Sequence, residues 1–309
     1  MADETGLPAF DHDVAVVGGG PAGCSAGVFT ARYGLDTVVF DRGRSSIQQC
    51  AHLENYLGFP GGIDVETFYA LLHDHAETAG CTIEPDLVES VEHADAGEGF
   101  RLEPQSGESV TARWVIAATR YDAGEYLRSL GDDAAMFVTH EHDGEPHERF
   151  DREYANADGS TPIAGLYVAS PYAETSPQAI MAAGRGARVG VAVVEAARRE
   201  RGYPEPVADY YDWVRREAER SGEWADRERW LEFYEGRFPD DHDLPDDRVE
   251  AIRDREVARR LDQYVTDEEV ERRGREGQRR LLDHVDDDIV LEVAREIEAE
   301  GEATPSDDD

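Results

Sequence analysis

The chain has 309 residues and a formal net charge of −38 at pH 7, because 69 acidic residues face only 31 basic ones. All 31 basic residues are arginine, since the sequence contains no lysine. The charge excludes a nucleic-acid binder, whose phosphate contacts need cations. The missing lysine excludes Schiff-base and phosphate-loop lysine chemistry. No apolar run approaches the roughly 18 residues of a membrane span.

The carboxylates are spread over the whole chain. At ordinary ionic strength so much like charge opposes compaction, whereas at molar salt the Debye length falls to about 3 Å and the repulsion is screened. We therefore expect a salt-adapted protein from a halophile; a dedicated acidic binding surface is the alternative. The acidic N-terminus has no apolar signal segment, which predicts a cytoplasmic protein. Cys24, Cys50 and Cys81 form neither a CxxC pair nor a zinc spacing, which favours buried thiols.

The first forty residues have the pattern of a β-α-β unit. Residues 13–17, DVAVV, are a short apolar run typical of a buried parallel strand. GGGPAG follows at 18–23, and residues 22–33 have the small and apolar composition of a closely packed helix. A second predicted strand, TVVF, occupies 37–40 and ends at Asp41. This order predicts an α/β fold with parallel strands.

The glycine motif inside this unit predicts a dinucleotide site. Gly18, Gly20 and Gly23 satisfy GxGxxG, in which the glycines permit a tight turn, close approach of a pyrophosphate, and packing of helix on strand. The helix N-terminus offers free N–H groups to the phosphates. Asp41, 23 positions after Gly18, is placed to accept a ribose hydroxyl and disfavours a 2′-phosphate. A ligand-free glycine turn is the alternative, and the motif alone does not separate FAD from NAD.

Later segments narrow the choice of cofactor. ENYLGFP occupies residues 54–60 and precedes a predicted helix at 65–80. After a predicted β-ribbon comes the strand VIAAT at 115–119. The strand at 166–169 then precedes a helix that starts near Gln178. In that order the segments resemble the FAD domain of thioredoxin-reductase-like flavoproteins, within the pyridine nucleotide-disulfide oxidoreductases.

The resemblance covers residues 11–200 and implies a single FAD-binding, Rossmann-like, three-layer domain with a β-ribbon. It implies FAD as the cofactor, with GGGPAG as its pyrophosphate loop, residues 86–88 near the adenine, and Asn55 and the helix at Gln178 near the flavin. The residues that the resemblance assigns to the cofactor are Gly18, Gly20, Pro21, Ala22, Gly23, Asp41, Arg42, Asn55, Val88, Ala118, Thr119, Ser170, Gln178 and Ala179.

Three features depart from that family. Residues 121–160 offer 40 residues without a second GxGxxG, too few for the family's inserted NADPH domain. The family's CxxC pair is absent. Arg120 replaces the last glycine of the family's ATG motif, and Ala169-Ser170 replaces its Gly-Asp pair. Ser170 accepts a hydrogen bond only as a neutral group, worth about 1 kcal/mol against roughly 1.5–3 kcal/mol for a charged acceptor. We expect FAD binding to survive this change.

Two other groups of residues suggest chemistry. Residues 139–147, THEHDGEPH, hold three histidines, and alternating histidines on a strand share a face that could bind a metal. The segment also has the pattern of a hairpin with Asp143-Gly144 at its turn, so solvated residues are favoured and no metal is predicted. Cys50 could form a flavin adduct with His52 as a proton relay. A packing role for Cys50 is favoured, because no resolving cysteine or evident base accompanies it.

Residues 205–300 differ in composition and predict a mostly α-helical appendage. Helices are predicted at 248–264 and 286–300, the latter with four aliphatic residues on one face. Residues 266–269 have the pattern of a capping box that opens another helix. The acidic tail, 301–309, is predicted to be disordered. One interpretation, which we favour, is that the appendage covers surface that is exposed in the absence of a nicotinamide domain. The alternative is that it docks a redox partner or a second subunit.

Together these features predict a thioredoxin-reductase-like, FAD-dependent oxidoreductase without its own NADPH domain or redox-active cysteine pair. Its redox partner would be a small molecule or a protein, and a homodimer is a candidate assembly. Dithiol oxidation with oxygen as acceptor would suit this layout. One alternative is a degenerate relative that keeps the fold as a binding or scaffold module without turnover. Another is a single-Rossmann, monooxygenase-type flavoprotein, for whose substrate sheet residues 121–160 leave little room.

Overall fold

The computed structural model describes residues 10–43, 45–94, 98–120, 124–142, 145–173 and 178–303. The predicted turn at Asp143-Gly144 and the chain after Ala303 lie outside these residues. The chain forms two compact units. Unit 1 comprises Met1–Asp212 and Tyr234–Ile252, and unit 2 comprises Trp213–Phe233 and Arg253–Asp309.

Unit 1 is built around a sheet whose five parallel strands follow the order β5-β2-β1-β8-β11. The strands β1, β2 and β11 are mostly buried, which is why they are apolar runs rather than alternating patterns. The strands are β1 (His12–Val17), β2 (Thr37–Phe40), β5 (Thr82–Glu84), β8 (Val110–Ala118) and β11 (Leu166–Ser170). The predicted α/β fold and the strands of its first β-α-β unit are confirmed, and β8 begins earlier than expected.

The register brings the carboxyl ends of three parallel strands to one edge of the sheet. Val17, the last residue of β1, pairs with Phe40 of β2 and with Ala117 of β8. The backbone N–H of Gly18 donates to the Phe40 carbonyl at 2.9 Å. The glycine loop and Asp41 therefore begin side by side, at the edge where open α/β sheets bind ligands.

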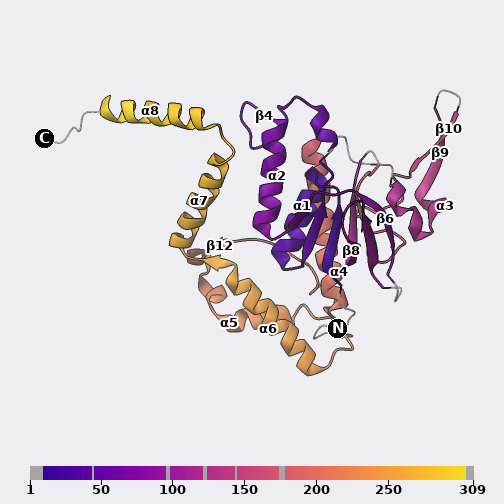
Figure 1. Cartoon of the computed structure of the whole chain (residues 1–309). Coiled ribbons are helices and arrows are strands. Elements are labelled where there is room, and N and C mark those ends of the chain that lie inside the picture. The colour runs from indigo at the N-terminus through magenta and orange to yellow at the C-terminus, as the bar shows by residue number, and fades with distance from the viewer. Residues whose placement is uncertain are drawn as a thin grey trace. The chain divides into compact units, whose positions relative to one another are not determined.

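Three long helices pack on one face of the sheet (Figure 1). They are α1 (Pro21–Tyr33), α2 (Val65–Ala79) and α4 (Ala179–Glu200). Gly34 and Gly80 end α1 and α2 in the left-handed conformation, as glycine does at helix C-termini. A Cβ placed on Gly186 of α4 would lie 1.9 Å from the carbonyl oxygen of Ala22. The small residues of these helices therefore allow backbone-to-backbone contact.

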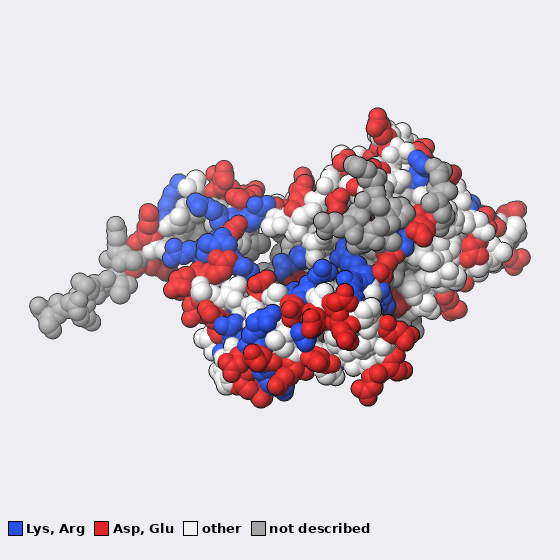
Figure 2. All heavy atoms as spheres, turned by 90° about the horizontal axis from the view of Figure 1, so that it is seen from below, with Lys and Arg blue, Asp and Glu red and all other residues white. Residues whose placement is uncertain are grey.

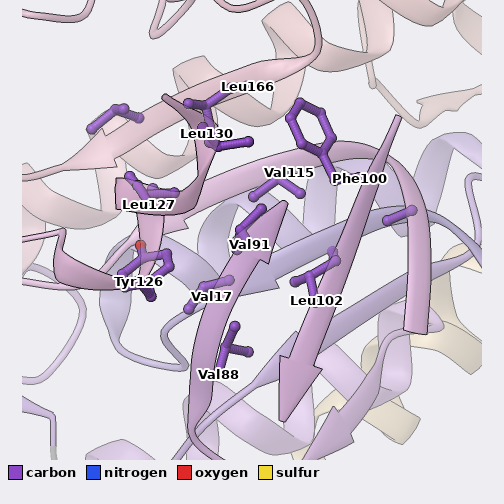
Figure 3. Close-up of a cluster of buried hydrophobic side chains, with 14 of the residues drawn as sticks. Val17, Val88, Val91, Phe100, Leu102, Val115, Tyr126, Leu127, Leu130 and Leu166 are labelled. Carbon is purple, nitrogen blue, oxygen red and sulfur yellow. The ribbon is translucent and has the colours of Figure 1, made fainter. Parts of the chain in front are cut away.

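A β-ribbon covers the other face of the sheet. Its strands β6 (Val88–His93) and β7 (Phe100–Pro104) pair antiparallel, and β7 pairs with the first residues of β8. Figure 3 shows the apolar core that this ribbon closes. The side chains labelled there are Val17, Val88, Val91, Phe100, Leu102, Val115, Tyr126, Leu127, Leu130 and Leu166.

Residues 121–160 form short helices and the predicted hairpin in their described part. The elements are η2 (Glu125–Leu130), α3 (Asp133–Met136), β9 (Phe137–His142) and β10 (Glu145–Phe150). Arg128 of η2 joins them, because its guanidinium lies 3.7 Å from the Phe137 ring centroid and 3.0 Å from Glu148. Tyr126 and Leu127 anchor η2 in the core below the ribbon.

The remaining elements are short in unit 1 and mostly helical toward the C-terminus. Between β2 and α2 lie η1 (Ser46–Gln49), β3 (His52–Leu53) and β4 (Ile63–Asp64). The C-terminal elements are β12 (Arg215–Arg216), η3 (Glu217–Glu219), η4 (Gly222–Ala225), α5 (Arg227–Glu235), α6 (Asp246–Asp262), β13 (Tyr264–Val265), α7 (Asp267–Leu282) and α8 (Asp287–Ala303).

Unit 2 has an aromatic cluster and highly exposed terminal helices. Trp224 and Trp230 lie 4.7 Å apart between ring centroids, and the Trp230 Nε1–H donates to the Trp224 carbonyl. Thr266 Oγ1 accepts the Glu269 N–H, which confirms the Thr266 half of the predicted capping box, while the Glu269 side chain pairs with Arg272 and Arg273. The aliphatic face of α8 is exposed, with Ile297 at 64% of its full exposure.

The charge pattern of the surface agrees with the sequence. Figure 2 shows carboxylates scattered over the displayed face, with arginines among them. Among the described residues, no helix combines the length and apolarity that a membrane crossing would require.

Candidate functional site

A cavity of about 660 Å³ opens at the carboxyl edge of the sheet in unit 1. This volume is within the roughly 300–1,000 Å³ of small-molecule and cofactor sites. Its wall combines the glycine loop, the ends of β2 and β8, residues after β11, and the start of α4. The predicted cofactor residues that line it are Gly18, Gly20, Pro21, Ala22, Asp41, Arg42, Asn55, Val88, Ala118, Thr119, Ser170, Gln178 and Ala179.

The glycine loop makes a tight turn in close contact with neighbouring backbone. Gly18 has φ +115°, and a Cβ there would lie 2.7 Å from the Ala118 carbonyl oxygen. Gly20 is the N-cap of α1, and a Cβ on it would meet only the side chain of Ser45. Gly23 does not line the cavity, because it packs against the loop itself, where a Cβ would lie 1.7 Å from Gly18 O. The loop thus leaves backbone N–H groups open at a helix N-terminus.

Asp41 lies at the cavity wall with its carboxylate held by several donors. Gly43 N–H donates to Oδ1 at 3.1 Å, and the Tyr69 hydroxyl donates to Oδ2. His73 Nε2 lies 3.1 Å from Oδ2. Burial alone would raise the pKa of Asp41, but these hydrogen bonds outweigh it and hold the pKa below its ordinary value. Asp41 is therefore an ionised acceptor beside the glycine loop.

A second carboxylate shapes the wall near β6. Asp86 Oδ2 accepts hydrogen bonds from Ser106 N–H, Ser106 Oγ and Gly107 N–H, and Oδ1 accepts from Leu87 N–H. Asp86, Leu87 and Val88 all line the cavity. These bonds fix the backbone of the segment that the family resemblance assigns to adenine.

The far end of the cavity joins segments distant in sequence. Asn55 Nδ2 donates to Gln178 Oε1 at 2.8 Å, which links ENYLGFP to the N-terminus of α4. Tyr172, after Ser170, lies under the Arg185 guanidinium at 3.8 Å from the ring centroid to the guanidinium carbon. Ser170 and Tyr172 both line the cavity.

Sequence reasoning missed several residues at this site. Arg152 and Tyr172 line the cavity although no motif indicates them. Tyr69 and His73, four residues apart on α2, reach Asp41, and a Tyr-x-x-x-His spacing in the predicted helix was the available signal.

The expected burial of the cysteines was correct for two of them and wrong for the third. Cys24 and Cys81 are buried, and burial raises the pKa of both thiols. Cys50 is exposed, because it follows the short helix η1 on the cavity wall rather than entering a core. His52 lines the same cavity.

The histidine hairpin offers no metal site in the part of the chain that the structure describes. His140 and His147 face each other across β9 and β10, with ring centroids 6.1 Å apart. Among the described residues, no group of three or more histidine, cysteine, aspartate or glutamate side chains could hold a metal ion.

Comparison with known proteins agrees with part of the predicted resemblance. The profile of the pyridine nucleotide-disulphide oxidoreductase family matches residues 12–121, so the resemblance is confirmed over that stretch. The thioredoxin reductase of Listeria monocytogenes serovar 1/2a is 30% identical over 122 residues, which are 39% of this chain and 36% of that protein. NADPH-dependent thioredoxin reductase 3 of Arabidopsis thaliana is 32% identical over 86 residues, 26% of this chain and 16% of that protein.

The chain thus spans little more than a third of the length of the first of these relatives. A search of solved structures found the atypical thioredoxin reductase TRi of Desulfovibrio vulgaris Hildenborough, with 19% identity and a TM-score of 0.49 over 62% of this chain and 100% of that one. The family match and the matched relatives together show that the N-terminal part of the chain is similar in sequence to pyridine nucleotide-disulphide oxidoreductases, thioredoxin reductases among them.

Proposed function

We propose that this protein binds FAD in the unit 1 cavity and acts as a thioredoxin-reductase-like oxidoreductase. One observation carries the proposal: a single cavity gathers the glycine loop, Asp41, and the start of α4, which lies about 160 residues after the loop. The match to the oxidoreductase family over residues 12–121 supports it independently.

The described residues fit the cofactor. The open N–H groups at Gly20 and the α1 N-terminus would hold the pyrophosphate, and Asp41 would accept a ribose hydroxyl. Asn55, Ser170 and the N-terminus of α4 would hold the flavin end, where the helix dipole favours negative charge. Bound FAD would supply two-electron redox chemistry.

Electrons would come from a small molecule or a protein partner rather than from a built-in NADPH domain. Support comes from the short helices and hairpin that the described part of residues 121–160 forms. A homodimer is the assembly we propose, because α8 keeps an exposed aliphatic face. The rival proposal is a scaffold without turnover, which the replacement of a charged acceptor by Ser170 favours.

The visible absorption spectrum of protein purified in molar salt tests the proposal. We expect flavin bands as isolated or after addition of FAD, and no bleaching by NADPH or NADH alone without oxygen. Gly20→Ala should weaken FAD binding about tenfold or more, because its methyl group displaces the pyrophosphate while Ser45 can rotate away. Gly184→Ala, whose methyl group would contact nothing within 4 Å, is the matched control. Absence of flavin bands even with added FAD would support the scaffold.

We also propose that the fold is adapted to high salt, because the net charge is −38 and the carboxylates are dispersed. Dialysis into low salt should unfold the protein as electrostatic screening is lost. Circular dichroism along a KCl titration measures this, and a fold that stays intact without salt contradicts it.

A further inference from the structure

The side of Asp41 away from its Gly43 contact is occupied by two residues of α2. Tyr69 and His73 lie one helical turn apart, with ring centroids 4.5 Å from each other. The Tyr69 hydroxyl donates to Asp41 Oδ2, and His73 Nε2 lies 3.1 Å from the same oxygen. The Asp41 side chain is only 7% exposed. A buried carboxylate with this many donors has one preferred orientation.

The two carboxylate oxygens of Asp41 differ in what they still accept. Oδ2 accepts the Tyr69 hydroxyl and lies 3.1 Å from His73 Nε2, whose one N–H it shares with the Gly19 carbonyl, so both groups from α2 meet at this oxygen. Oδ1 receives the N–H of Gly43 among the described residues and keeps one further lone pair. Since Asp41 lines the cavity, Oδ1 is the atom available to a ligand there.

His73 also reaches the glycine loop. Its Nε2 lies 3.1 Å from the carbonyl oxygen of Gly19, the same distance as from Asp41. A Cβ on Gly19 would lie 2.5 Å from the Cβ of Asp41, so the loop rests directly on the acid. The His73 imidazole therefore contacts both Asp41 and the glycine loop, and it links both to α2.

We propose that Tyr69 and His73 are positioning residues for an adenosine ribose: they hold Asp41 so that Oδ1 accepts a ribose hydroxyl while the glycine loop holds the phosphates. The inference rests on the proposed dinucleotide function of this cavity. The competing interpretation is that the two residues only fasten α2 to the sheet. The two interpretations differ in one measurable respect. If the two residues only fasten α2 to the sheet, replacing them should not change the preference of the cavity for ligands that carry ribose hydroxyls.

The experiment compares two probes, ADP and 2′,3′-dideoxy-ADP, which differ only in those hydroxyls. Calorimetric titration of the full chain in molar salt gives both affinities. The unaltered chain should prefer ADP by roughly tenfold, as expected for a charge-assisted hydrogen bond. Tyr69→Phe and His73→Ala should each reduce that preference toward unity. Tyr69→Phe should also leave the affinity for dideoxy-ADP nearly unchanged, because the Tyr69 hydroxyl donates to Asp41 and not to the glycine loop, whereas His73 contacts both. His73→Gln should restore part of the preference, because its amide N–H can still donate to Asp41.

His75→Gln is the matched control, since His75 is exposed on the same helix. The proposal is overturned if the α2 variants keep the full preference for ADP, or if they lose both ligands equally. It is also overturned if the unaltered chain binds both probes with the same affinity. Failure of the unaltered chain to bind ADP and FAD at all would instead remove the proposed function itself. Tyr69→Phe deletes a single oxygen, so it keeps the test valid if His73→Ala does not fold.

Discussion

Two glycines of α4 in unit 1 allow another helix to approach closely. At two glycines of α7 in unit 2, by contrast, an added Cβ would contact no atom. A Cβ on Gly186 or Gly190 would collide with carbonyl oxygens of α1, at 1.9 and 2.7 Å. Cβ atoms on Gly274 and Gly277 would find no atom within 4 Å. Close packing thus requires glycine at these positions of α4, whereas in α7 glycine only lowers the helix propensity.

Two charged sites, one in each unit, differ in burial. In unit 1, Asp41 is almost buried and is held by a tyrosine, a histidine and a backbone N–H. In unit 2, Glu269 accepts hydrogen bonds from Arg272 and Arg273, which lower its pKa to about 2, yet Arg272 is 61% exposed. Buried pairs fix geometry, while exposed pairs are screened by salt and contribute little. The difference belongs to these two sites and not to whole units, because unit 1 also has the exposed Arg128–Glu125 pair and unit 2 also has Glu256, which is 1% exposed beside Arg259.

The largest effect should follow from filling the α1–α4 contact. Gly186→Ala places a methyl group against the Ala22 carbonyl, which only a movement of one helix can relieve. We expect a loss of about 3 kcal/mol in the free energy of unfolding, the upper range for overpacking. Denaturant unfolding in molar salt, followed by far-ultraviolet circular dichroism, measures this loss.

Gly184→Ala, two positions earlier in α4, is the control, because its methyl group would meet nothing within 4 Å. It should raise the stability by about 0.5–1 kcal/mol through helix propensity alone. Equal effects of the two substitutions would contradict the close packing of α1 on α4.

Much of unit 1 could be predicted from the sequence because its signals are local. The apolar strand β1, the glycine loop and the αL glycine at Gly34 are each encoded within a few residues. The cavity residues after Ala118 were predicted only through a family resemblance, since nothing local places Gln178 next to Asn55. The placement of Ser170 in the cavity wall likewise depends on the pairing of β11 with β8.

The features that could not be predicted from the sequence depend on how helices and turns are oriented relative to the rest of the fold. The spacing of Tyr69 and His73 predicts that both lie on one face of α2, but it does not predict that this face is turned toward Asp41. Cys50 looked like a packing residue because a lone thiol is usually buried, whereas its place on the cavity wall follows from the turn after η1. For α8, periodicity predicted an aliphatic face correctly without indicating what covers it.

A pH-dependent effect should distinguish the His73 contact from the exposed pairs of unit 2. The hydrogen bond to Asp41 raises the pKa of His73 above its ordinary 6.5, against the effect of burial. A raised folded pKa contributes stability that is complete below pH 6.5 and is lost as the pH rises through the folded value. The stability difference between the unaltered chain and His73→Gln should therefore be largest below pH 6.5 and shrink above it.

The groups that face His73 do not titrate in this window. Asp41 stays ionised because its pKa is lowered, and Tyr69 stays neutral because burial and the neighbouring carboxylate raise its pKa. Glu77 on α2 also acts on His73, because its proximity raises the pKa of the imidazole. Denaturant unfolding of both proteins in molar salt, from about pH 5 to about pH 9, measures the difference. A difference that stays constant with pH would show that the charge of His73 contributes nothing.

The smallest effect should come from filling a glycine of α7. Gly274→Ala adds a methyl group in open space within a regular helix, so it should stabilise unit 2 by about 0.5–1 kcal/mol. Three of the four tryptophans, Trp213, Trp224 and Trp230, lie in unit 2, so their fluorescence during denaturant unfolding reports on that unit. Gly222→Ala is the matched control: it also has open space, but its φ of +62° is strained for alanine and should make unit 2 less stable. FAD binding should be the same in both variants, and a change in either would mean that the cavity of unit 1 depends on unit 2.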